Sequence, residues 1–439
     1  MEILKNKNFR RLIIGQATSQ FGSNMQQFAL SLYVLAITGS ATIFASIIAI
    51  SIVPRLVLSP IAGVFGDWFD RKKSIVRLDL LNGVLIGAYA VYYFINGSLS
   101  LPSIYLLVVL LEITEIFFGC SMAAVVPSML PKEKLLEANR IKAIVSSFSN
   151  IASPVLASMM YSFFGIQILL IVNAISFVIS ALSEMTIDIP KLNKKPVKLD
   201  MKSFVNDLKE GINIVKNTKM IRLIISVGVI INFSLSALFG VGVLYIVLEI
   251  MRASEVEYGL ITTAMASSML VGPLLLGKFI SKMKVGKLFI TSFGLINVFI
   301  FLMGIISTEA FLSMFDSNLI PLSILGILVF LSGMLSTLVN VSIGTLFDTL
   351  VPIEFMGRTA SITNLCLLIA TPIGQILFGF GIDFLSTSLT FFIINGIILV
   401  TLVYFRKPFI ESDRETHKSV VQTHAAEESL VMETVMENA

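Results

Sequence analysis

Histidine, cysteine and charged residues are scarce in this chain of 439 residues. Only 14% of its residues are charged and 56% are hydrophobic, whereas a soluble domain is about 25% charged and roughly 45–50% apolar. Together with a mean hydropathy of +0.90, this excludes an ordinary soluble enzyme. Because a membrane-spanning helix needs about 20 apolar residues, the composition predicts an all-α integral membrane protein embedded in the lipid bilayer.

The few histidines and cysteines exclude several kinds of site. His417 and His424 lie in the polar C-terminal tail, so no imidazole is available among the apolar runs to bind a metal or relay a proton. Cys120 and Cys366 lie in separate apolar runs, too few for a disulfide framework or a thiolate metal site. The sequence contains neither a GxxxxGK[ST] phosphate loop nor a GxGxxG turn after a strand. We expect no metal, no cofactor, no nucleic-acid partner and no enzymatic activity.

Twelve apolar runs are long enough to span a bilayer. They occupy residues 12–36, 42–66, 74–95, 103–126, 142–163, 166–187, 221–248, 257–280, 287–306, 319–347, 359–381 and 386–405. These runs predict a six-helix half at 1–187, a linker at 188–220, a second six-helix half at 221–408 and a tail at 409–439. The tail is polar and rich in acidic residues, and we expect it to be disordered.

Positive charge predicts the orientation of these helices. All but two of the 32 Lys and Arg residues lie in the N-terminal segment, in alternate connections, in the linker or in the tail, or within four residues of these segments at the ends of the runs. The exceptions are Arg252, in a connection on the other side, and Arg55, within a span. Because positively charged loops stay in the cytoplasm, both termini are expected there, in a multi-pass protein of the inner or plasma membrane.

The linker also has a helical pattern. Its apolar residues recur at helical spacing, at Met201, Phe204, Leu208, Ile212 and Val215. Its polar face carries Lys202, Lys209 and Lys216. This pattern predicts an amphipathic helix, which either lies on the inner membrane surface or caps the bundle.

The two halves share a weak internal repeat. At an offset of 218 residues, Arg140 aligns with Arg358 and Pro154 aligns with Pro372. Each half therefore has an arginine where its fifth helix begins and a proline within that helix, at a position suited to helix packing. Two such halves joined by a cytoplasmic linker imply a pseudo-two-fold axis along the membrane normal, with a binding site at their interface.

The loop between the second and third runs carries a family resemblance. Its sequence, Gly63-Val-Phe-Gly-Asp67-Trp-Phe-Asp-Arg71-Lys-Lys73, resembles the GxLaDrxGrkx signature of the major facilitator superfamily. Together with Arg77-Leu-Asp79-Leu and Leu136-Glu-Ala-Asn139-Arg140, it makes the chain most similar to the macrolide-efflux-type drug:proton antiporters of that superfamily. The resemblance implies the major facilitator fold, with twelve transmembrane helices in two pseudo-symmetric halves, and export of a small molecule.

Charges of both signs in this loop predict a latch on the cytoplasmic side. An aspartate that faces arginines and the end of a neighbouring helix forms charge-assisted hydrogen bonds that break when the halves move. The residues expected to form this gate are Asp67, Arg71, Asp79, Arg140 and Arg358. The alternative is a solvated loop whose charge only fixes the topology.

Three charges lie deep within the first half, Arg55 in its second run and Glu112 and Glu115 in its fourth. A charge at mid-membrane costs about 2.5–3.5 kcal/mol, so it usually faces a partner or a watery cavity. At a spacing of three the glutamates share one helix face. Two acids and one base leave one carboxylate unmatched, and burial favours its protonated form. We expect proton coupling at these glutamates; alternatively, Arg55 and one glutamate form a fixed pair while the other reaches cavity water.

Polar side chains form a stripe along the first run. Gln16, Gln20, Asn24 and Gln27 recur at intervals of four, four and three residues, which places them on one helix face. We expect this stripe to line the central cavity and contact substrate; the alternative is hydrogen bonding between helices. Weaker candidates in the second half are Asn232, Asn340, Asn364 and Gln375.

The sequence therefore predicts a secondary transporter that works as a monomer by alternating access. Its expected partners are a lipophilic small-molecule substrate and protons as the coupling ion. Two alternatives stay open at this point. One is an importer or facilitator of a metabolite with the same fold. The other is a non-transporting membrane sensor or assembly factor that acts through the linker and tail.

Overall fold

The computed structural model of the chain describes residues 3–58, 70–131, 134–189, 212–213, 215–216, 219–280, 283–350, 353–408 and 410. Asp67, most of the linker with its expected amphipathic helix, and the tail beyond residue 410 lie outside these residues. The side chain of Arg358 lies outside the description as well.

The described part of the first half consists of helices. They are α1 (Lys7–Thr38), α2 (Ala41–Ile50, within an apolar span that continues to Leu58), α4 (Arg71–Asn96), α5 (Leu101–Met129) and α6 (Leu135–Met185). Local sequence sets the ends of α1. The Asn6 side chain accepts hydrogen bonds from two backbone N–H groups of the first turn, and Gly39 ends the helix in the left-handed conformation.

The 51 residues of α6 form two helices that meet at Gly165. This glycine has φ 69° and ψ −171°, a backbone conformation that is essentially confined to glycine. It lies between the expected runs 142–163 and 166–187, where the sequence predicts a connection.

Contacts with α1 show that the two parts of α6 run in opposite directions. Gln20 and Asn24 hydrogen-bond to Ser146 and Asn150, so the first part runs parallel to α1. The second part is antiparallel, because Gly22 lies beside Ser176 and Gly15 beside Ser180. The chain therefore crosses the bundle twice within α6.

The second half repeats this architecture. Its elements are α8 (Lys219–Ala237), the π-helical η3 (Leu238–Gly242), α9 (Val243–Tyr245), the π-helical η4 (Ile246–Ile250), α10 (Glu255–Ile280), α11 (Val285–Ile306), α12 (Glu309–Leu312), α13 (Leu319–Leu350), α14 (Ile353–Phe384) and a helix at Thr387–Pro408. Residues 221–250 form one long span through α8 and the π-helical turns.

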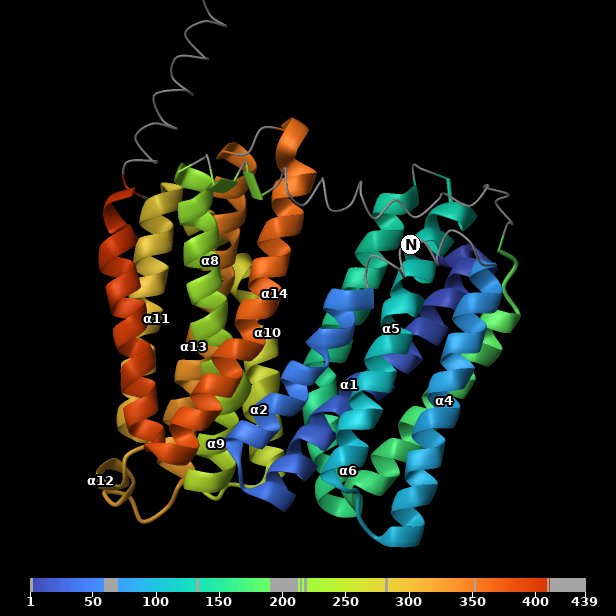
Figure 1. Cartoon of the computed structure of the whole chain (residues 1–439), viewed down its shortest axis with the longest axis horizontal. Helices are drawn as coiled ribbons and strands as arrows, with labels where there is room; N and C mark the ends of the chain where they lie inside the picture. Colours follow the sequence, from blue (N-terminus) through green and yellow to red (C-terminus); the bar gives the residue numbers. More distant parts are fainter. Residues whose placement is uncertain are drawn as a thin grey trace, which may run out of the picture.

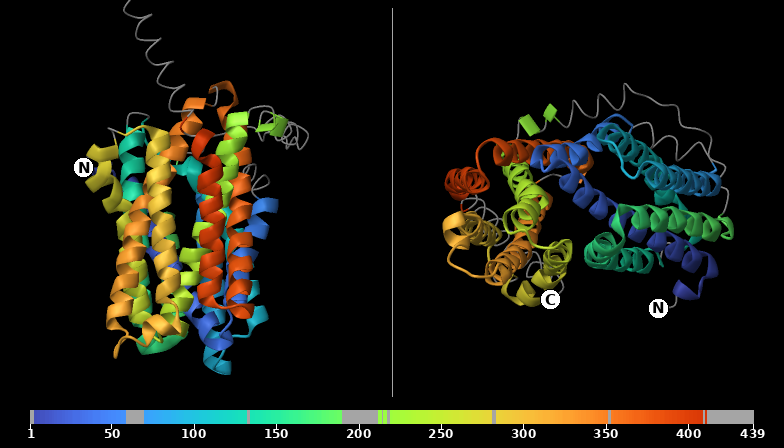
Figure 2. Two further views of the ribbon diagram at one scale, coloured as in Figure 1. Left: turned by 90° about the vertical axis from the view of Figure 1, so that its left-hand side faces the viewer. Right: turned by 90° about the horizontal axis from the view of Figure 1, so that it is seen from below.

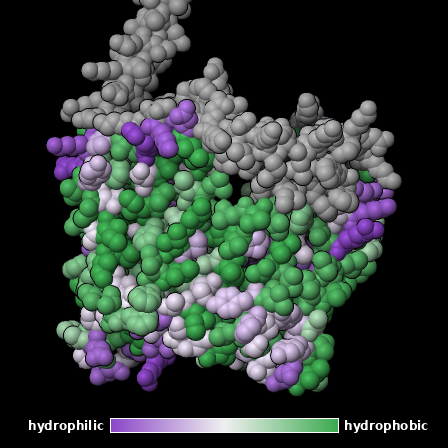
Figure 3. Space-filling view, in the orientation of Figure 1, coloured by the Kyte–Doolittle hydropathy of each residue, from purple (hydrophilic) through white to green (hydrophobic). Residues whose placement is uncertain are grey.

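Ten of the described helical spans are long and apolar enough to cross a membrane. Helix α6 is counted once among these ten but forms two helices. Helix α1, which is 32 residues long but polar along one stripe, is not among the ten. With these two additions the number fits the expected twelve. Hydrophobic side chains cover the middle of the face in Figure 3, and hydrophilic side chains gather at its two ends. This is the surface of a protein that lies across a bilayer.

The helices form two groups that stand side by side, and α2 leans from the first group towards the second (Figure 1). Seen from below, the groups lie on opposite sides of the molecule (Figure 2, right). The end of the bundle at which α1 begins is named the near end here, and the end that carries α12 is named the far end. Helices α4, α8, α11 and α14 begin at the near end.

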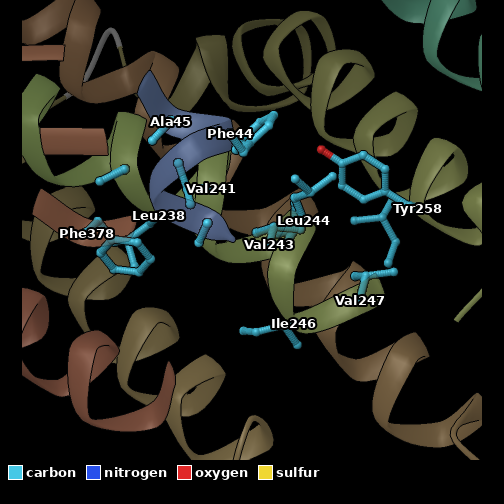
Figure 4. Close-up of a cluster of buried hydrophobic side chains, with 14 of the residues drawn as sticks. Phe44, Ala45, Leu238, Val241, Val243, Leu244, Ile246, Val247, Tyr258 and Phe378 are labelled. Carbon is cyan, nitrogen blue, oxygen red and sulfur yellow. The ribbon is translucent and has the colours of Figure 1, made fainter. Parts of the chain in front are cut away.

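The largest apolar core joins the two halves. Phe44 and Ala45 of α2 lie among Leu238, Val241 and Phe378 of the second half (Figure 4). Helix α2 packs against α14, and α6 packs against α10. Because the residues in these contacts belong to the far half of each helix, the described structure holds the two halves together at the far end.

Candidate functional site

Arg55 and Glu112 form an ion pair within the first half. The Arg55 Nε atom lies 2.7 Å from Glu112 Oε1, and its Nη2 atom lies 2.5 Å from the same oxygen. The Glu112 side chain is 12% exposed and the Arg55 side chain 47% exposed. Both residues lie within apolar spans, so the ion pair lies among the membrane-spanning helices.

Glu115 lies one helical turn from Glu112, on the same face of α5. It is exposed, and its carboxylate interacts electrostatically with both Glu112 and Arg55. The three residues therefore form a cluster of two acids and one base. An arginine–glutamate pair with a second glutamate outside it is part of one of the two arrangements that the sequence allows.

Asp79 does not lie with the exposed residues of the expected gate. It is 1% exposed and packs inside the first half, whereas Arg140 on α6 is exposed. The acid that the structure brings to Asp79 is Glu184 of α6, which is 0% exposed and interacts electrostatically with it. Sequence reasoning did not single out Glu184, although an acid inside an apolar run was the signal that identified Glu112.

The rest of the gate is described only in part. Arg71 is the first residue of α4, and Asp70 caps that helix by accepting a hydrogen bond from the backbone N–H of Lys73 at 3.1 Å. Asp67 and the side chain of Arg358 lie outside the described residues. The latch between Asp67 and Arg71 therefore stays a prediction.

The polar stripe of α1 faces the first part of α6. Gln20 donates a hydrogen bond to Ser146 at 3.1 Å, and Asn24 donates to Asn150 at 2.9 Å. Gln16 and Gln20 also line a cavity of about 280 Å³ together with Lys142. Gln27 is exposed. The middle of the stripe thus bonds between helices, and its near part borders a polar cavity.

An apolar cavity of about 660 Å³ adjoins the polar one, since Val145 lines both. It lies between α1 and both parts of α6, and its walls include Phe21, Met25, Phe148 and Met160. The Phe21 and Phe148 rings stack with centroids 6.5 Å apart. Phenylalanine and methionine walls adapt to many apolar shapes.

The candidates of the second half make contacts within it. Asn232 donates to the Gly228 carbonyl of its own helix at 3.0 Å, Asn340 and Asn364 are exposed, and Gln375 is buried with its Nε2 atom 3.4 Å from the Ser236 carbonyl. The hydrogen bonds of Asn232 and Gln375 are therefore made within the second half and not with the cluster of Arg55, Glu112 and Glu115.

Pro154 and Pro372, the prolines that the internal repeat aligns, lie at close helix contacts. A Cβ atom on Gly259 of α10 would lie 2.9 Å from the Pro154 carbonyl oxygen, so α6 and α10 approach closely there. Two residues after Pro372, a Cβ on Gly374 would clash with the Phe233 carbonyl group of α8. The first contact joins the two halves, and the second lies within the second half.

Asp383 joins the halves at the far end, a role that sequence reasoning missed. Its carboxylate accepts hydrogen bonds from the Ser40 hydroxyl at 2.7 Å and from the backbone N–H groups of Ala41 and Thr42, each at 3.1 Å. A carboxylate of α14 thereby caps the N-terminus of α2, where the helix dipole favours negative charge. The sequence gives no signal for this contact, because two of its partners are backbone groups 341 and 342 residues away.

Comparison with known proteins decides the family. The sequence pattern described as Major Facilitator Superfamily matches residues 12–371. The chain belongs to the major facilitator superfamily. It is 27% identical over 403 residues to macrolide efflux protein A of Streptococcus pyogenes, covering 90% of this chain and 94% of that protein. It is 28% identical over 345 residues to macrolide efflux protein A of Enterococcus faecalis, covering 76% of this chain and 99% of that protein.

The fold of the superfamily is also found in solved structures. The nucleoside transporter NupG superimposes with a TM-score of 0.68 at 13% identity, covering 93% of this chain and 99% of that one. As a member of the major facilitator superfamily, the chain is a multi-pass membrane transporter and not an enzyme. The resemblance read from the loop signature and the all-α major facilitator fold expected from it are confirmed, and the described helices fit the expected count of twelve.

Proposed function

We propose that the chain is a proton-coupled exporter of hydrophobic or amphipathic small molecules of the macrolide kind, working by alternating access. The observation that carries the proposal is the pairing of Arg55 with Glu112 beside the exposed Glu115, inside the apolar spans of a relative of macrolide efflux proteins. An unmatched acid at this depth suits reversible protonation.

Substrate recognition is proposed for the adjoining cavities beside α1. The apolar cavity of about 660 Å³ would take the hydrophobic body of the substrate. Gln16, Gln20 and Ser146 around the cavity of about 280 Å³ would bind its polar groups, with Asn24 and Gln27 as further contacts. Such a division, with an apolar wall and a few placed polar groups, is typical of small-molecule sites.

Alternating access is proposed as a motion of the two halves. Their described contacts lie at the far end, where Asp383 caps α2 and α10 packs on α6. The near end carries most of the positive charge, so we assign it to the cytoplasm. Substrate would be captured from the cytoplasmic side, and breaking the far-end contacts would release it outside.

Accumulation of radiolabelled erythromycin, a macrolide, in energised cells tests this function. Cells that express the wild-type chain should accumulate less label than cells with an empty vector. Adding a protonophore should abolish the difference, and Glu115→Gln should do the same at equal abundance. Glu309→Gln serves as the matched control, because Glu309 is an exposed acid in the far-end helix α12.

The opposite results would overturn parts of the proposal. If the wild-type chain raises accumulation, transport runs inward and the export direction is wrong. If export persists undiminished when the proton gradient is collapsed, proton coupling is wrong.

A further inference from the structure

Two acidic side chains that interact electrostatically are buried in the interior of the first half, apart from the Arg55–Glu112 pair. Asp79 of α4 is 1% exposed and Glu184 of α6 is 0% exposed. Their helices pack closely, since a Cβ on Gly83, one turn from Asp79, would lie 3.3 Å from the Ala174 carbonyl oxygen. Glu184 is the penultimate residue of α6, so the two acids lie towards the near end.

The carboxyl oxygens of these acids are largely without partners. Both oxygens of Glu184 and Oδ2 of Asp79 are buried without a hydrogen bond. The Ser180 hydroxyl, which is fully buried one turn before Glu184, lies beside the Asp79 carboxylate and is itself without a hydrogen-bond partner. A third buried polar group is therefore directed at the same place.

The charged groups around the two acids do not neutralise them. From α5, Glu115 adds a further negative charge that acts on Asp79.

The cations of the packed helices point elsewhere: Arg77 of α4 and Arg11 of α1 are exposed, and Arg11 donates to the Thr186 carbonyl at 2.9 Å. Lys142, on the first part of α6, lines the polar cavity. Within the described residues, neither Asp79 nor Glu184 takes part in an ion pair.

Two adjacent carboxylates in a low-dielectric interior repel each other, and each has lost its hydration. Ionising both without a counter-charge costs several kcal/mol per ion, and sharing one proton removes most of that cost. A metal ion fits less well. Hard cations take six or more oxygen ligands, and the described residues contain no cluster of three or more His, Cys, Asp or Glu side chains suited to a metal.

We propose that Asp79 and Glu184 form a proton-binding site in the interior of the first half, in which the two carboxyl groups share one proton. Glu115 links this site to the ion pair at mid-span, because its charge acts on Asp79 and on Glu112. A proton that leaves the Glu115 carboxyl forms a new O–H bond on Asp79, while the proton already held leaves Glu184 once water reaches this buried carboxyl group from the near end. This relay rests on the proposed function, whereas the shared proton does not.

Infrared spectroscopy of the purified full-length chain in lipid nanodiscs tests the site without substrate or gradient. The wild type at neutral pH should show the C=O stretching band of a protonated carboxylic acid. The double variant Asp79→Asn/Glu184→Gln should lose intensity equal to one carboxyl group, and the control Glu309→Gln should keep the full band. Should the double variant fail to fold, the single variant Asp79→Asn should keep the intensity of the band but shift its frequency, because the proton left on Glu184 is no longer shared with a second carboxyl group.

Two results would overturn the proposal: a folded wild type without the band, or a band of equal intensity in the variant that lacks both acids. Failure of the exporter proposal looks different. In that case the band is present and depends on Asp79 and Glu184, but expression of the chain leaves erythromycin accumulation unchanged.

Discussion

Four acidic residues of the first half lie inside helices that are otherwise apolar, and their surroundings differ. Glu112 pairs with Arg55, Glu115 is exposed, and Asp79 and Glu184 are buried together. Sequence identified the two glutamates of α5 because a charge in the middle of an apolar run is conspicuous. It offered Arg55 as the partner of one of these glutamates without deciding which, and it did not reveal that Asp79 and Glu184 interact, because partners lie on other helices and depend on how those helices pack.

The two glutamates of α5 should differ in what their replacement changes: Glu112 contributes to stability, and Glu115 is needed for transport. Glu112→Gln removes the charge that holds Arg55 and should lower the free energy of unfolding by about 1 kcal/mol, the upper range for a partly exposed pair. Glu115→Gln should leave the melting temperature unchanged and abolish export. Thermal unfolding of the purified variants measures the first effect. Equal melting temperatures for Glu112→Gln and the wild type would show that the pair adds nothing to stability.

Single helices follow the sequence closely. The described ends of α4, α5, α10 and α11 lie within a few residues of the apolar runs, because chain length in the bilayer and polar end residues fix where a span begins and ends. The connection at Gly165 is tighter than the sequence predicts. A single residue with positive φ turns the chain there, where the sequence suggests only a short break.

Gly165→Ala should destabilise the first half. An alanine at φ 69° and ψ −171° is strained by on the order of 1–3 kcal/mol, so we expect a lower melting temperature. Gly119→Ala is the control, because a Cβ at Gly119 of α5 meets no atom within 4 Å and its backbone is helical. If the two variants unfold at the same temperature, the turn at Gly165 tolerates a side chain and the strain argument is wrong.

The two halves of the molecule meet through contacts that involve backbone as much as side chains. Asp383 binds the first turn of α2, and Gly379 lets α14 approach α2, since a Cβ there would lie 2.7 Å from the Ala41 carbonyl oxygen. Gly259 does the same between α10 and α6. Closure at the far end therefore depends on small residues and one carboxylate, and small changes there should shift the balance between conformations.

Asp383→Ala should favour separation of the halves at the far end. Losing hydrogen bonds to a charged acceptor costs about 1.5–3 kcal/mol, and the cost is smaller at this exposed position. We therefore expect the ratio of molecules open at the far end to molecules closed there to rise roughly fivefold. Pulsed electron paramagnetic resonance measures this shift as a change in the distance between two spin labels. The labels are attached at Ser98→Cys and Asp316→Cys, both exposed far-end positions, in a chain whose Cys120 and Cys366 are replaced by serine. Glu309→Ala should leave the distances unchanged, and unchanged distances in Asp383→Ala would show that the cap does not hold the halves.

Deleting residues 411–439 should leave transport intact, because the helices that carry the acids and the cavities all precede residue 411. Erythromycin accumulation at matched abundance measures this. Loss of export by a folded, membrane-inserted deletion variant would favour a role for the tail in binding a partner, as a sensor or assembly factor requires.

The sequence by itself determined that this chain crosses a membrane many times, which superfamily it belongs to and which mid-span charges to examine. These properties follow from hydropathy, charge and short motifs, which act locally along the chain. Only the tertiary structure decided that Arg55 meets Glu112, that Asp79 meets Glu184, and that Asp383 caps a helix of the other half. Such contacts join residues from 57 to 342 positions apart, and helix packing, which periodicity does not encode, sets which faces meet.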